Sequence, residues 1–202
     1  MNFEFVIPTY KRPHQLMMTI NCIYSQTVDN WRISVVADAD YEGYSKVVDY
    51  FKGDDRIRFH TLEGGPNNDW GHTPRIYGMQ NAKEGWLIMT GDDNYYFPCF
   101  LEYFNRCVDD KTNFIFCDFY HNYTNYIPET AELRRIDTLD GNSRYEGLDV
   151  GCYATRSELA KKIPFQKHLH WADGQFAADY WSAFCREEGA IKKVNHRFYV
   201  HN

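Results

Sequence analysis

The chain has 202 residues, of which 44% are hydrophobic and 17% aromatic, enough for one sizeable core and too few for two ordinary domains. A formal net charge of -6 without any lysine or arginine run argues against a nucleic-acid partner, which needs clustered cations to displace counterions. No segment reaches the roughly 18 apolar residues that a membrane span requires, and no basic region precedes the short apolar N-terminal stretch. We therefore expect one domain over residues 1–202 in a soluble, cytoplasmic protein, or in a host cytoplasm if a virus encodes it.

Apolar runs and helical spacings alternate through the first half of the chain. Strands are predicted at residues 3–7, 33–37, 57–62 and 86–90, and helices at 12–25, 44–51 and 73–82. This alternation predicts an α/β fold with a mainly parallel sheet flanked by helices. Its ligand site would lie beyond the carboxyl ends of the strands, in loops 8–12, 38–42 and 91–98.

The pattern is weaker after residue 98. Strands are expected at 114–119, 150–155 and 198–200, and a late helix is expected to begin at Asp173. The polar stretch 120–146 has no clean period, and an unstructured loop of that length would be unusual. We expect it to be partly ordered, as a lid or as part of an acceptor site.

The predicted strand 86–90 runs directly into Asp92, Asp93 and Asn94. Adjacent carboxylates repel each other, and hard oxygen ligands at this edge suit Mg²⁺ or Mn²⁺, which can also bridge a diphosphate. A solvated turn that caps the helix after Pro98 would use the same residue types. On these residues alone, both interpretations stay open.

Four segments together resemble the GT-A fold of family 2 glycosyltransferases. Phe5 to Arg12 is similar to the opening strand of that family, and Val35 to Asp40 to its second strand and acidic turn. Gly71 to Arg75 is similar to a Gly-x-x-x-Arg segment, and Thr90 to Asn94 falls at the Asp-x-Asp position. No one motif is specific, but the four occur in order and at family-like spacing, and the resemblance as a whole covers nearly the whole chain.

The resemblance implies a metal-dependent, inverting glycosyltransferase of the hexosyltransferase type. Its donor would be a nucleotide diphosphate sugar, here a UDP-sugar, and its acceptor a hydroxyl of a glycan or glycoprotein. Residues 1–97 would form the half that binds nucleotide sugar and metal, and residues 98–202 the acceptor side. The implied cofactor is Mn²⁺ or Mg²⁺.

The same resemblance assigns roles at the donor end. The residues that would line the nucleotide pocket are Pro8, Thr9, Tyr10 and Arg12. Asp38 would accept a hydrogen bond from the ring N–H of the base, and Arg75 would lie near the diphosphate. Asp149 would contact hydroxyls of the donor sugar.

The metal assignment depends on how the Asp-x-Asp motif is aligned. Alignment on Pro98 places Gly91 at the first carboxylate, so Asp93 would be the metal ligand. Asp92 would support the site through the donor ribose or a water molecule. His201, just past a short predicted strand, would be an additional metal ligand.

Inverting transfer requires a base that takes the proton of the acceptor hydroxyl. Asp173 and Asp179 are both candidates, because spacing from Phe165 favours Asp173 and spacing back from Gly189 favours Asp179. At about 100° per residue, Asp173 falls within the apolar stripe of the late helix and Asp179 lies off it, so Asp173 is expected to face the sheet. As the expected N-cap, Asp173 would alternatively do no more than bind backbone N–H groups. Trp171 beside it would stack on an acceptor sugar or pack as a hydrophobic staple.

Two rival functions remain at this level. A nucleotidyltransferase would also use a metal-bound carboxylate, but it normally has a Gly-rich phosphate loop after the first strand, and none follows Ile7. A non-catalytic nucleotide-sugar or glycan-binding module of the same fold stays open because Gly91 departs from the motif.

Overall fold

The computed structural model describes residues 2–122, 133–136 and 148–202. Its first half is a parallel sheet in the order β3-β2-β1-β4, made of β1 (Phe3–Thr9), β2 (Trp31–Ala37), β3 (Ile57–Thr61) and β4 (Trp86–Met89). All of β1 is buried, as expected for a parallel strand that is covered on both faces. The carboxyl ends of these strands meet at one edge.

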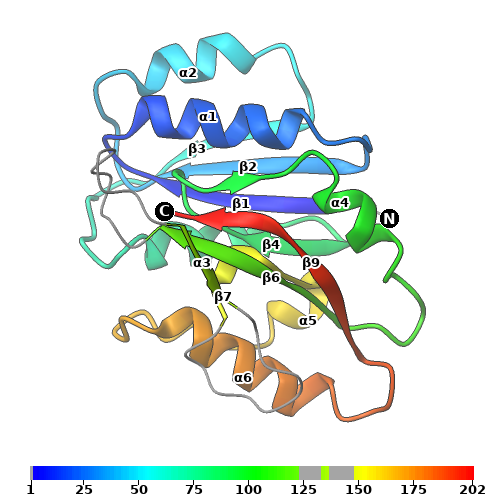
Figure 1. Ribbon diagram of the computed structural model, residues 1–202. Helices are drawn as coiled ribbons and strands as arrows, with labels where there is room; N and C mark the ends of the chain where they lie inside the picture. Colours follow the sequence, from blue (N-terminus) through cyan, green and yellow to red (C-terminus); the bar gives the residue numbers. More distant parts are fainter. Residues whose placement is uncertain (1, 123–132, 137–147) are drawn as a thin grey trace.

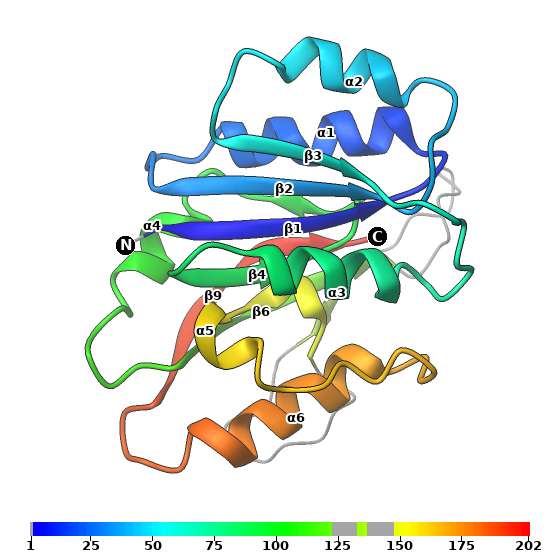
Figure 2. The same cartoon turned by 180° about the vertical axis from the view of Figure 1, so that it is seen from behind.

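Helices cross between the parallel strands on both faces of the sheet. They are α1 (Pro13–Tyr24), α2 (Tyr44–Phe51) and α3 (His72–Asn81). Helix α1 lies on the face turned toward the viewer in Figure 1, and α3 lies on the opposite face, seen in Figure 2. The predicted strands and helices of this half agree with the structure to within two residues at each end.

The second half of the sheet mixes strand directions. It contains β5 (Tyr95–Tyr96), β6 (Phe114–Asn122), β7 (Leu133–Ile136), β8 (Tyr153–Arg156) and β9 (Ile191–His201). Strand β8 is antiparallel to both β4 and β6, while β6 and β9 run parallel. Strand β5 pairs with β9 and β7 with β6, both antiparallel. The fold is thus the predicted α/β sheet flanked by helices, and its parallel part is the half that carries the loops of interest.

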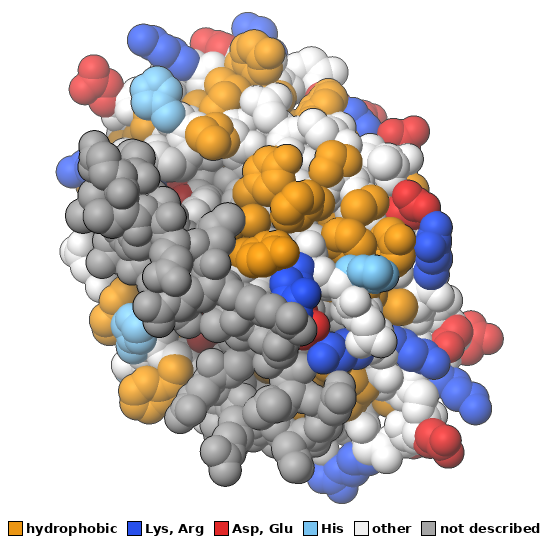
Figure 3. Space-filling view, in the orientation of Figure 1, with side chains coloured by type: hydrophobic (Ala, Val, Ile, Leu, Met, Phe, Trp, Pro, Cys, Tyr) orange, Lys and Arg blue, Asp and Glu red, His pale blue; other side chains and the backbone are white. Residues whose placement is uncertain are grey.

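Three further helices accompany these strands in the described part of the chain, namely α4 (Phe100–Asn105), α5 (Ser157–Ala160) and α6 (Ala172–Phe184). Helix α6 lies at the bottom of both views, near α5. On the face shown in Figure 3, hydrophobic side chains gather near the middle and basic side chains are interspersed with acidic ones. None of the helices in the described ranges combines the length and the hydrophobicity that crossing a bilayer would take.

The structure corrects three predictions in the second half. Residues 150–155 begin as a 3-10 turn, η3 (Val150–Cys152), because the Asp149 side chain accepts a hydrogen bond from Gly151 N. The strand predicted at 198–200 is the end of the eleven-residue β9, so His201 is a strand residue. Helix α6 has Trp171 as its N-cap, which places Asp173 in the first turn and not at the cap. Of the stretch 120–146, β6 takes the beginning and β7 a short part, and the remainder lies outside the described residues.

Candidate functional site

A cleft of about 520 Å³ opens where β1, β2 and β4 end. The predicted site residues in its wall are Pro8, Thr9, Tyr10, Arg12, Asp38, Arg75, Asp92, Asp93, Asp149, Asp173 and His201. Asp179 is not in this wall, and its carboxylate accepts a hydrogen bond from Gln175 Nε2 at 2.8 Å. Elements far apart in the sequence therefore bring the predicted residues, apart from Asp179, into one cavity.

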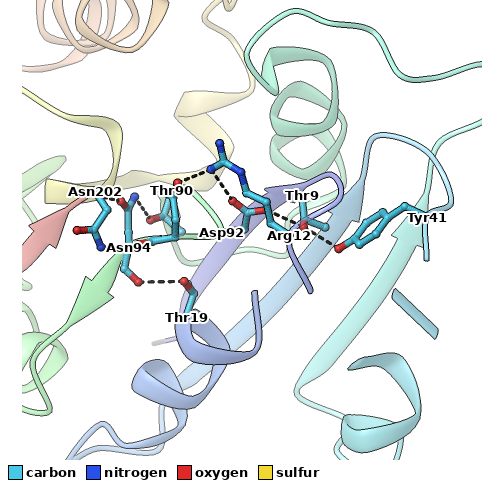
Figure 4. A network of polar contacts seen from close by, with 9 residues as sticks. Thr9, Arg12, Thr19, Tyr41, Thr90, Asp92, Asn94 and Asn202 are labelled. Carbon is cyan, nitrogen blue, oxygen red and sulfur yellow. Dashed lines mark hydrogen bonds and ion pairs between the residues drawn. The ribbon is translucent and has the colours of Figure 1, made fainter. Parts of the chain in front are cut away.

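A pair of carboxylates lies at the end of β4. Asp92 is only 5% exposed and accepts a hydrogen bond from Thr9 Oγ1 at 2.7 Å, as Figure 4 shows. Since Thr9 donates its one hydroxyl proton to Asp92, the Tyr41 hydroxyl at 2.9 Å must donate to Thr9. The Arg12 guanidinium lies 3.5 Å from Asp92 and forms a closer ion pair with Asp93. Burial, together with the charge of Asp93, raises the pKa of Asp92 to about 6.

The backbone of this carboxylate loop is fixed by amide side chains. Asn94 Nδ2 donates to Thr90 Oγ1 at 3.0 Å, and Asn202 Nδ2 donates to the carbonyl of Asp93 at 2.7 Å. A Cβ atom at Gly91 would come within 2.8 Å of Asp93 Oδ1, so a side chain there would displace that carboxylate.

The described residues fit a divalent cation only in part. His201 Nε2 is 3.5 Å from Asp149, and His201 Nδ1 is buried without a hydrogen-bond partner. Within the described ranges, no three His, Cys, Asp or Glu side chains come close enough together to enclose a cation. A cation at Asp93 would take most of its ligands from a bound diphosphate, which is how Mg²⁺ commonly binds beside one or two carboxylates. The acidic oxygens at the end of β4 suit that mode.

The guanidinium of Arg75 is a buried positive charge in the cleft wall. Arg75, 7% exposed, donates from Nη1 to His72 Nδ1 at 3.1 Å, and its Nε is buried without a hydrogen-bond partner. His72 Nε2 lies 3.1 Å from the carbonyl of Leu169. A guanidinium only donates and a carbonyl only accepts, so His72 is the neutral tautomer with its proton on Nε2. Burial and the charge of Arg75 lower the pKa of His72, which agrees with this state. The unsatisfied donor makes Arg75 a suitable partner for an anion.

Asp38 is held in the cleft wall by Asn67. Its two carboxylate oxygens accept hydrogen bonds from the backbone and the side-chain amides of Asn67, the former at 2.8 Å. Each oxygen keeps a second lone pair for a ligand donor. The predicted base-reading role of Asp38 is compatible with these bonds.

Two carboxylates occupy the side formed by η3 and α6. Asp149 is buried and accepts hydrogen bonds from Gly151 N at 2.8 Å and from the Tyr199 hydroxyl. Asp173 Oδ1 accepts from Gly174 N at 2.9 Å. Burial, reinforced by the charge of Asp149, raises the pKa of Asp173. Asp173 is therefore a carboxylate of increased basicity in the cleft wall.

Sequence reasoning missed several residues of the site, namely Tyr41, Asn67, Trp70, His72 and His170. Most of them lie in loops without periodicity. Their roles come from contacts across the cleft, so no local pattern marks them.

The family described as glycosyl transferase family 2 matches residues 4–166. The chain belongs to this family. A relative from Rickettsia bellii (strain RML369-C), an uncharacterized glycosyltransferase, is 24% identical over 139 residues, which are 68% of this chain and 19% of that protein. The family 2 chain thus spans less than a fifth of this relative.

Solved structures share the fold over almost the whole chain. TarS 1-349 of S. aureus in complex with UDP has a TM-score of 0.76 at 18% identity, covering 99% of this chain and 60% of that one. The mannosyltransferase PcManGT of Pyrobaculum calidifontis, in complex with GDP-Man and Mn²⁺, has a TM-score of 0.68 at 11% identity, covering 99% and 56%. At these identities the likeness shows the GT-A fold alone.

Proposed function

We propose that this family 2 glycosyltransferase transfers a hexose from a UDP-sugar to a hydroxyl of a glycan or glycoprotein, with inversion and with Mn²⁺ or Mg²⁺. The supporting observation is that the strand-end carboxylates, the buried Arg75 and Asp173, whose pKa is raised, all line the same cleft. These are three groups that sugar transfer needs, for a metal, a diphosphate and an acceptor proton. Residues 1–97 would provide the donor half and residues 98–202 the acceptor half.

The donor would lie along the ends of β1 and β2. Uracil would donate its ring N–H to a lone pair of Asp38, between Pro8, Thr9 and Tyr10. The diphosphate would face Arg75, whose buried Nε would gain an acceptor. The neighbouring TarS structure contains UDP, which supports uracil as the base, whereas PcManGT contains GDP-Man.

The bound metal ion would supply positive charge to the departing diphosphate. Asp93 would hold it, with Asp92 in support and His201 as a further ligand. Arg12 pairs with Asp93 in the protein alone, and 47% of its side chain is exposed, which leaves room to turn toward a phosphate. Before the donor binds, Arg12 would neutralise the charge of Asp93. After the donor binds, it would neutralise the charge of the diphosphate.

Asp173 would act as the base. The acceptor oxygen attacks the anomeric carbon and gives its proton to the Asp173 carboxylate, as the bond from that carbon to the diphosphate oxygen breaks. A raised pKa makes the carboxylate a better proton acceptor near neutral pH. Asp149 would hold the site from behind, through its bonds to Tyr199 and Gly151, and would contact the donor sugar with its remaining lone pairs.

Calorimetry with UDP, GDP and CDP, each with Mn²⁺ and with EDTA, tests the donor part of this proposal. We expect UDP to bind most tightly of the three. Its affinity should decrease strongly in EDTA, because the diphosphate then lacks a neutralising cation. Equal binding of all three nucleotides in EDTA would exclude both the uracil pocket and the metal site.

A further inference from the structure

Among the described residues, Trp70 is the one large hydrophobic residue in the cleft wall whose side chain is exposed. It is 61% exposed, and its backbone has φ of 58°, in the left-handed region that a bulky residue rarely adopts. Burial of the indole therefore cannot explain why a tryptophan occupies this position, and the left-handed backbone conformation disfavours a bulky residue there. Such strain persists where the surrounding structure enforces it, often at a site that handles a ligand.

Contacts on both sides of Trp70 hold it in place. Ahead of it, Asn67 is clamped to Asp38, and Gly65 packs so closely that a Cβ atom there would lie 1.7 Å from the Asp38 carbonyl oxygen. Next to it, Asp69 accepts hydrogen bonds from the backbone N at 2.9 Å and the hydroxyl at 2.6 Å of Thr73. A loop that is held in this way loses little backbone entropy when a ligand packs on Trp70.

The neighbours of the ring place it beside the acceptor side of the cleft. Its centroid lies 5.4 Å from that of His170, in an edge-to-face arrangement, and 5.9 Å from that of His72. His170 also lines the cleft and precedes Asp173 by three residues. His72 fixes this segment through its bond to the Leu169 carbonyl. Trp70 is therefore linked to the segment that carries the candidate base.

The surroundings indicate what kind of molecule would bind there. A pyranose ring has one face of C–H groups, which packs on an aromatic ring, and a rim of hydroxyls, which need polar partners. The exposed indole supplies the apolar surface, and Asp69, His170 and Asp173 supply polar groups in the same cleft wall. A nucleobase would find its own partners at Asp38.

We propose that Trp70, with His170 at its edge, is the platform on which the sugar ring of the acceptor lies while one hydroxyl faces Asp173. This inference rests on the proposed function and names its acceptor as a glycan. Trp171, for which the sequence left both sugar stacking and packing open, is 58% exposed and is not in the cleft wall.

The test is an NMR titration of protein carrying ¹⁵N-labelled tryptophan, with the indole resonances of Trp70 and Trp171 assigned from single variants. The probes are the methyl glycosides of glucose, galactose, mannose and N-acetylglucosamine, added with and without UDP and Mg²⁺. We expect at least one glycoside to shift the Trp70 resonance in a saturable way and to leave that of Trp171 unmoved.

Three variants make the test specific. Trp70→Ala should weaken binding of that glycoside about three- to tenfold, the usual range for losing one aromatic contact, while Trp70→Tyr should largely retain it. Both carry the same backbone strain, so their difference isolates the ring. Trp171→Ala is the matched control and should bind like the wild type, and the melting temperature and UDP affinity of each variant report whether the fold is intact.

Two results would overturn the platform. In one, no glycoside shifts Trp70; in the other, Trp171→Ala loses glycoside binding and Trp70→Ala keeps it. A Trp70 shift with UDP alone and none with any glycoside would assign the ring to the nucleobase instead. Failure of UDP to bind would count against the proposed function. The titration without UDP would still test whether Trp70 binds a sugar.

Discussion

Replacement of Asp92 by asparagine should make the metal-free protein more stable at neutral pH. Asp92 is almost completely buried beside Asp93, and its pKa is raised from 3.8 to about 6. The folded protein therefore binds more protons than the unfolded chain between these two values, and its stability falls as the pH rises through them. Asparagine removes this ionisation and keeps an oxygen to accept the bond from Thr9.

The size of the effect follows from the shift in pKa. A rise of about two units corresponds to about 3 kcal/mol of lost stability once Asp92 is ionised in the folded state, above pH 7. At pH 4.5 Asp92 is still protonated in the folded protein, and the loss is about 1 kcal/mol. The Asp92→Asn variant should therefore exceed the wild type by about 2 to 3 kcal/mol at pH 8, or roughly 5 to 10 °C in melting temperature.

Urea unfolding in EDTA at pH 4.5 and pH 8 measures this difference. Asp179→Asn, the same chemical change outside the cleft, controls for the removal of one negative charge. The prediction is refuted if Asp92→Asn is no more stable than the wild type at pH 8, or if the difference in stability does not increase with pH. Either result would mean that burial and the charge of Asp93 do not raise the pKa of Asp92. A higher free energy of unfolding in the variant would mean that the adjacent carboxylates of Asp92 and Asp93 destabilise the protein when no ligand is bound.

Further substitutions separate the proposed roles. Asp93→Ala should abolish the Mn²⁺ dependence of UDP binding in calorimetry, and Asp92→Ala should be milder; equal losses would mean that the motif is aligned wrongly. Arg75→Gln should weaken UDP binding by roughly tenfold or more, as for loss of a charged hydrogen bond, and unchanged affinity would remove Arg75 from the diphosphate site. Asp173→Asn should lower turnover by roughly 10² to 10⁴-fold with UDP binding unchanged, whereas Asp179→Asn should do little; the reverse result would transfer the role of base to Asp179. In the wild type, kcat/KM should fall as the pH decreases through the raised pKa of Asp173, since a base must be deprotonated, and an acid limb at the ordinary aspartate value would contradict this.

The first half of the fold could be predicted because its signals are local. Strands β1, β2 and β4 are mainly apolar, β3 alternates apolar and polar residues, and α1 to α3 have helical spacing, so hydrophobic periodicity gives their type and approximate bounds. Parallel strands end at one edge, and this geometry places Thr9, Asp38 and Asp92 around one cleft before any contact is known.

The second half depends on partners that lie far away in the sequence. Strand β9 contains Lys192, Lys193 and His196 before its short apolar run at residues 198–200, and this polar first part forms a strand by pairing with β6. The turn at Val150–Cys152 depends on Asp149, which is held by Tyr199 fifty residues later. The N-cap of α6 was misplaced because aspartate is the common cap, whereas Trp171 occupies that position here.

The site shows the same division between local and spatial signals. Asp93 could be proposed from the strand before it, but its ion pair with Arg12 needs the folded loop. Trp70 follows a loop of glycine, proline and asparagine, and only the clamp between Asn67 and Asp38 shows that the loop holds it at the cleft.

The most direct test of sugar transfer is the release of UDP from UDP-sugars by the purified chain, with water or a methyl glycoside as acceptor. We expect release to require Mn²⁺ or Mg²⁺, to increase when the glycoside is added, and to disappear in Asp93→Ala. Binding of UDP without any metal-dependent release, with either acceptor, would contradict transfer and would identify the chain as a nucleotide-sugar-binding module of the same fold.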